Sequence, residues 1–184
     1  MQSEHFGRPA RAQSEWVVLI AIATIAGSVV FACAAPFAAV AAFAALHLGR
    51  RDAFFLIGIV WAANQAIGYG FLGYPQTWSS VGWGLAIGAG AAVATGAAMA
   101  TAHRTERLGP LPAALAVFAV AFAAYQLALF AATAVLPSSA GAFDLPVVLY
   151  VLQVNAAAFA MLAAARALAR AAGLPVPGAG RTSA

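Results

Sequence analysis

The side chains of this protein best suited to recognition are amides and aromatic rings that lie within long apolar runs. Amides donate and accept hydrogen bonds without carrying a charge, so together with aromatic walls they suit a small, largely uncharged organic ligand. The candidate binding residues are Trp61, Asn64, Gln65, Trp83, Tyr125, Gln126, Gln153 and Asn155.

Helical spacing predicts that several of these residues share one level. Trp61, Asn64 and Gln65 follow the pattern i, i+3, i+4 and therefore lie on one face. At about 1.5 Å per residue, amides from three runs fall roughly 10–15 Å below the same end of the bundle. Gln153 and Asn155 are about 200° apart around a helix, so one of them must bond to a neighbouring helix. Hydrogen bonding between helices, worth about 0.6–2 kcal/mol, is the alternative role for each amide.

No catalytic or metal-binding pattern accompanies the amides. The sequence has no credible Ser-His-Asp, Cys-His or paired-carboxylate arrangement, and no His/Cys/carboxylate cluster with metal-ligand spacing. No Asp, Glu, Lys or Arg lies in the middle of an apolar run, which argues against an ion-coupled pump or a proton relay. We therefore expect a protein that is not an enzyme and that uses no cofactor and no metal.

Composition indicates that lipid is the solvent for most of the surface. The chain is 64% hydrophobic and 8% charged, whereas soluble domains carry roughly 25% charged residues. The net charge of +4 comes from arginines spread along the chain, so it does not indicate nucleic-acid binding. The expected class is an all-α integral membrane bundle whose first partner is the lipid bilayer.

The apolar runs predict six transmembrane helices, and Pro36 divides the first two. As a single helix, residues 16–48 would be about 50 Å long, against a hydrocarbon core of about 30 Å. The alternative is one long kinked helix and five spans. The expected spans are 16–35, 37–48, 53–72, 80–102, 111–136 and 146–169. We expect residues 1–15 to form a polar cytoplasmic N-terminus, 16–172 the transmembrane domain and 173–184 a flexible cytoplasmic tail.

The basic residues predict the orientation. All nine are arginines, and the loops near 74–79 and 137–145 have none. Because arginine is retained on the cytoplasmic side, both termini are expected in the cytoplasm. The composition, rich in Ala and Gly and without Lys, favours a bacterial cytoplasmic (inner) membrane. The arginines are Arg8, Arg11, Arg50, Arg51, Arg104, Arg107, Arg166, Arg170 and Arg181.

Small residues at helical spacing predict faces where helices approach closely. Gly84 and Gly88 form a G-x-x-x-G pair in the fourth expected span, and Ala23 and Gly27 form a similar pair in the first.

The layout resembles the substrate-binding S component of energy-coupling-factor (ECF) transporters, which are small six-helix membrane subunits. The features that carry the resemblance are the Ala23/Gly27 face, the stretch from Ala35-Pro36-Phe37 to Leu48-Gly49-Arg50-Arg51, and the loop Gly73-Tyr74-Pro75. The resemblance implies a pocket toward the outer side, a coupling transmembrane subunit and partner ATPases. It also implies that the Ala23/Gly27 face docks the coupling subunit. The Met-His N-terminus of nickel and cobalt members is absent, since Gln2 follows Met1. An organic micronutrient is therefore the expected ligand.

Two hypotheses follow from these observations. In the first, the chain captures a small organic ligand from outside, and a partner ATPase module supplies the energy. In the second, it is a non-transporting structural or accessory subunit of a membrane complex, whose amides join helices. A co-purified ligand would distinguish the two.

Overall fold

The computed structural model describes residues 35–138, 140–174 and 176, and this part of the chain is helical, with no strand. Four of its five helices are long and apolar enough to cross a membrane. The fifth, α2, is short. The helices are α2 (Phe37–His47), α3 (Arg50–Gly70), α4 (Trp78–Arg104), α5 (Pro110–Ala132) and α6 (Leu145–Ala171).

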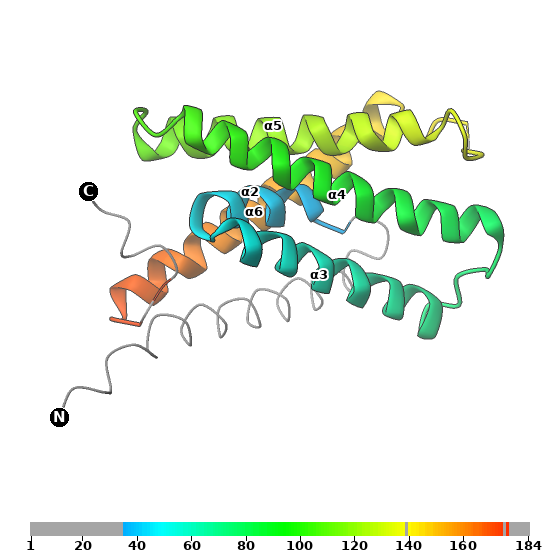
Figure 1. The fold of residues 1–184 in the computed structure, drawn as a ribbon, viewed down its shortest axis with the longest axis horizontal. Coiled ribbons are helices and arrows are strands. Elements are labelled where there is room, and N and C mark those ends of the chain that lie inside the picture. Colours follow the sequence, from blue (N-terminus) through cyan, green and yellow to red (C-terminus); the bar gives the residue numbers. More distant parts are fainter. Residues whose placement is uncertain (1–34, 139, 175, 177–184) are drawn as a thin grey trace.

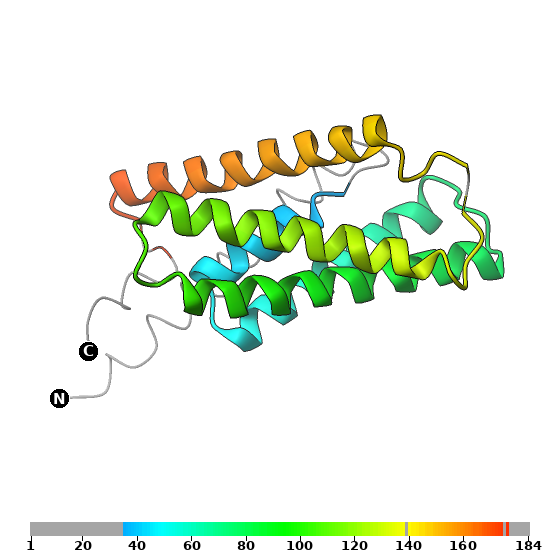
Figure 2. The ribbon, with the colours of Figure 1, turned by 90° about the horizontal axis from the view of Figure 1, so that it is seen from above.

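The four long helices lie side by side and alternate in direction (Figures 1 and 2). Their lengths of 21 to 27 residues correspond to about 31–40 Å, which is enough to cross the hydrocarbon core of a bilayer. The starts of α3 and α5 and the ends of α4 and α6 face one end of the bundle. This end, which carries the arginines of the described residues, is called the arginine end below, and the opposite end is the far end.

Helix α2 lies in the middle of the bundle and contacts α3, α4, α5 and α6. Its 11 residues are about 16 Å long, roughly half of what a span requires. Every residue from Phe37 to Ala45 is buried. Helix α2 begins directly after Pro36, where the sequence predicts a break. The structure does not confirm a transmembrane helix over residues 37–48, because α2 is a short helix inside the bundle. The first expected span, 16–35, lies outside the described residues apart from Ala35.

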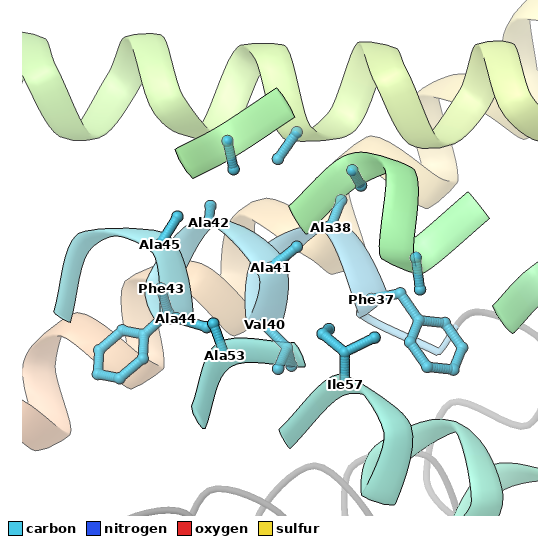
Figure 3. Close-up of a cluster of buried hydrophobic side chains, with 14 of the residues drawn as sticks. Phe37, Ala38, Val40, Ala41, Ala42, Phe43, Ala44, Ala45, Ala53 and Ile57 are labelled. Atoms are coloured by element: carbon cyan, nitrogen blue, oxygen red, sulfur yellow. The ribbon is translucent and has the colours of Figure 1, made fainter. Parts of the chain in front are cut away.

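The composition of α2 explains its position. Ala38, Ala42 and Ala45 share one face and let the neighbouring helices approach closely, while Val40 lies on the side of Ile57 from α3 (Figure 3). Because this helix has apolar side chains on every face, it can be buried all round. The core of the described region is therefore built around a helix without lipid contact.

The ends of the helices follow local rules. Thr77 caps α4 by accepting a hydrogen bond from Ser80 N at 3.3 Å. Pro112 and Pro146 lie in the first turns of α5 and α6, where a missing N–H costs nothing. The expected bounds of the third to sixth spans differ from those of α3 to α6 by one to four residues, and small differences of this kind are normal for helix ends.

Candidate functional site

A cavity opens among α3, α4, α5 and the start of α2, in the half of the bundle away from the arginine end. Its volume is about 290 Å³. The lining mixes amides, hydroxyls and aromatic rings and has no charged side chain. The residues that line it are Ala35, Phe37, Asn64, Gln65, Tyr69, Tyr74, Ser80, Trp83, Gly84, Ile87 and Tyr125.

Helix α3 contributes the amides of Asn64 and Gln65, which are adjacent in the sequence and bonded to each other. Gln65 Nε2 donates to Asn64 Oδ1 at 3.2 Å. This bond uses one donor and one acceptor, and each amide can form more hydrogen bonds than this. The pair therefore offers both donors and acceptors to a molecule in the cavity.

Two glycines of α4 determine how closely α3 packs beside the cavity. The side chain of Gln65 lies against Gly84, and the indole of Trp61 lies against Gly88. A Cβ on Gly88 would lie only 2.7 Å from Trp61 Nε1. Trp61 Nε1 also donates to Gly84 O at 2.8 Å. The predicted G-x-x-x-G pair thus accommodates two side chains spaced i, i+4 on α3, as such motifs do between membrane helices.

At the far end, the loop between α3 and α4 folds back over the mouth of the cavity. Tyr74 N donates to Gly68 O at 3.0 Å, and the Tyr74 ring lies directly on Gly68. The Tyr69 ring meets the Tyr74 ring edge-on at 6.0 Å between centroids, and its hydroxyl bonds to Ser80 Oγ at 3.1 Å. These contacts hold two tyrosines at the mouth.

Trp83, at the mouth of the cavity, is hydrogen-bonded to the loop between α5 and α6. Its Nε1 donates to Pro137 O at 2.9 Å. Beside it, Leu136 packs on Gly82. The indole face of Trp83 therefore stays in position as one wall of the cavity.

The inner end of the cavity is aromatic. The rings of Phe37 and Tyr125 are 6.0 Å apart between centroids and tilted by 41°. Tyr125 is only 5% exposed, and it lies seven residues before the end of α5, which is about 10 Å into the bundle. Tyr125 is one of the candidate binding residues that the sequence indicated.

The structure brings Asn64, Gln65, Trp83 and Tyr125 together and places the other four candidates elsewhere. Trp61 faces a separate apolar groove of about 260 Å³ between α3 and α4. Gln126 is half-buried and does not line the cavity, and Gln153 is exposed. Of the three helices whose amides were expected at one level, only α3 therefore supplies amides to this cavity.

Asn155 joins two helices. It is fully buried, its Oδ1 accepts from Ala39 N at 3.1 Å, and its Nδ2 donates to Val151 O at 2.9 Å. Asn155 thus satisfies a backbone N–H in the first turn of α2, which has no partner within its own helix. Of the pair Gln153 and Asn155, it is Asn155 that bonds to a neighbouring helix.

Three polar lining residues were not among the sequence candidates: Tyr69, Tyr74 and Ser80. Tyr69 follows Gln65 by four residues, so the helical spacing that grouped the α3 candidates could have found it. Tyr74 could not be found in this way, because it reaches the cavity only through the fold of its loop. The proposed docking residues Ala23 and Gly27 lie outside the described residues.

No acidic or basic side chain lines the cavity. Among the described residues, no three His, Cys, Asp or Glu side chains are close enough to hold a metal ion. At the arginine end, burial and then the nearby Arg166 and Arg170 lower the pKa of His47 to about 4. What the cavity offers chemically is hydrogen bonding and aromatic contact.

Comparison of the chain with protein-family models, with curated proteins and with solved structures finds no match.

Proposed function

We propose that this multi-pass protein is a substrate-binding transport subunit, which captures a small, largely uncharged organic molecule in the cavity between α3, α4 and α5. The observation that supports the proposal is the neutral, amide- and aromatic-lined cavity of about 290 Å³. Small-molecule sites typically combine apolar and aromatic walls with a few placed polar groups. A cavity of this size suits a molecule of one or two rings.

The chemistry of the lining supports a neutral ligand. An ion would lose its hydration on binding, and no charged side chain of the lining offsets that cost. The amides of Asn64 and Gln65 replace the hydrogen bonds that a neutral polar ligand makes with water. Trp83 and Phe37 provide apolar contact.

The transport role itself rests on the resemblance to S components of ECF transporters. In that arrangement a coupling transmembrane subunit and partner ATPases supply the energy, and the site faces outward in a bacterial cytoplasmic membrane. The cavity lies in the half away from the arginines, which is the outer half if the arginines are cytoplasmic.

An accessory, non-transporting subunit is the second candidate, and one observation favours it. Trp61 and Asn155 both hydrogen-bond to the backbone of a neighbouring helix. In these two cases a polar side chain within the membrane region stabilises the bundle and does not face the cavity.

The deciding experiment purifies the protein in mild detergent and identifies co-purified small molecules by mass spectrometry. We expect a bound organic molecule whose occupancy falls at least threefold in Asn64→Ala, because the variant loses a lining amide. Gln153→Ala is the matched control, since this amide is exposed and away from the cavity, and it should keep full occupancy.

Equal occupancy in both variants would place the molecule outside this cavity and contradict the proposal. Absence of any bound molecule, together with unchanged growth of a deletion strain on limiting micronutrients, would favour the accessory role.

A further inference from the structure

The inner end of the cavity contains a hydroxyl that has no hydrogen-bond partner among the described residues. Tyr125 is 5% exposed and lines the cavity. Among the hydrogen bonds of the described residues, none involves its hydroxyl, whereas the side chains of Asn64, Gln65, Tyr69, Ser80 and Trp83 in the same lining are bonded. Buried hydroxyls normally have a partner.

The cavity can supply that partner. In the described region, the Tyr125 hydroxyl is not among the unbonded side-chain atoms that are closed off from solvent. It therefore keeps access to the space that Tyr125 lines. A molecule in the cavity can accept the O–H hydrogen bond that the protein leaves unmade.

The start of α2 borders the same space. Ala35 and Phe37 line the cavity at the end of α2 where backbone N–H groups point outward and carry a partial positive charge. One N–H of this turn already donates to a neutral carbonyl oxygen, that of Asn155. The inner end of the cavity therefore presents an O–H donor beside a weakly positive helix start.

We infer that this inner end binds a neutral carbonyl oxygen of the ligand, with the Tyr125 hydroxyl as its donor. A carbonyl oxygen accepts the hydrogen bond and is favoured by the helix dipole. A cation has no acceptor to offer and is repelled by the start of α2. A carboxylate accepts as well, but it must lose more hydration in a lining without a charged side chain.

This inference rests on the proposed function and specifies one part of its ligand. The test uses benzamide, benzoate and benzylammonium, which share a ring and have similar sizes but differ in the polar group. Binding to the full chain in detergent is measured by quenching of tryptophan fluorescence, because Trp83 lines the cavity. Empty micelles give the background.

Benzamide should bind at least threefold more tightly than either charged compound. Tyr125→Phe should weaken benzamide binding at least threefold, which corresponds to the loss of one hydrogen bond. Tyr150→Phe is the matched control: it removes a tyrosine hydroxyl from an exposed position on α6 and should leave all three affinities unchanged. Tyr125→Phe keeps the ring that packs on Phe37, so its thermal stability should equal that of the wild type.

The outcomes separate the two proposals. If none of the three compounds binds but the Asn64→Ala experiment shows a ligand in the cavity, only the inference fails; if that experiment also finds no ligand there, the proposed function fails with it. If all three bind equally, if benzoate or benzylammonium binds most tightly, or if Tyr125→Phe leaves benzamide binding unchanged, only the inference fails. Loss of folding in Tyr125→Phe would show that the hydroxyl has a partner within the protein, and would also overturn the inference.

Discussion

Replacing Asn155 with alanine should destabilise the bundle by about 2–3 kcal/mol, because it removes the side chain that caps α2 from another helix. The Asn155 Oδ1 atom accepts from Ala39 N at 3.1 Å. Residues Ala39 and Asn155 are both fully buried, so water cannot replace the lost acceptor.

The magnitude follows from the two hydrogen bonds of this side chain. An unsatisfied buried N–H at Ala39 costs about 1–3 kcal/mol. The Val151 carbonyl loses only a second hydrogen bond, since in a regular helix it also accepts from the backbone N–H four residues later. The void left by the truncated side chain adds to the loss, because buried packing relaxes only in part. Together these effects give about 2–3 kcal/mol.

The assay is reversible unfolding in mixed micelles, in which the fraction of SDS is raised and tryptophan fluorescence is followed. The free energy of unfolding of Asn155→Ala is compared with that of the wild type and of Gln153→Ala. Gln153 lies on the same helix but is exposed, so its replacement should change stability by less than about 0.5 kcal/mol.

A result for Asn155→Ala within about 0.5 kcal/mol of Gln153→Ala would refute the reasoning. It would mean that the first turn of α2 does not depend on this cap, and that the burial of α2 has another cause.

Two further predictions concern other parts of the bundle. Gly88→Ala should lower the free energy of unfolding by about 1–3 kcal/mol through overpacking, since a Cβ there would lie 2.7 Å from Trp61 Nε1. The control is Gly96→Ala on the same helix, which should be neutral or stabilising because a Cβ there would have nothing within 4 Å. Equal losses of stability in both variants would contradict the close packing at Gly88. For His47, whose pKa is lowered from 6.5 to about 4, the unfolded chain binds a proton that the folded chain does not. The same unfolding assay, run from pH 7 to pH 4, should therefore show the free energy of unfolding falling as the pH falls below about 6.5, by at most about 3 kcal/mol. His47→Gln should remove this part of the pH dependence. An identical pH profile in the variant and the wild type would refute the assignment to His47.

The sequence predicted the long helices well because their signals are local. The length of each apolar run indicates where α3 to α6 lie, and Pro146 marks the first turn of α6. Pro36 likewise indicated where α2 begins. The burial of α2 was not predicted, because an alanine-rich helix has no polar face to show whether lipid or protein surrounds it.

The candidate cavity was predicted only in part, because the rotation of each helix is not a local property. Tyr125 and Gln126 are adjacent and about 100° apart around α5, so only one of them can face inward. The sequence emphasised Gln126, and the fold places Tyr125 in the cavity. Tyr69 could have been found from its spacing to Gln65. The position of Tyr74 in the cavity could not, because it depends on how the loop between α3 and α4 folds back onto the end of α3.

The short length of α2 has a consequence for biogenesis. A segment of about 16 Å is too short to insert stably across the bilayer by itself, and its first turn depends on a residue 116 positions further along the chain. The ribosome must therefore synthesise the last long helix before this segment can settle in its final position. We therefore expect the packing of α2 to be a late step in the assembly of this protein.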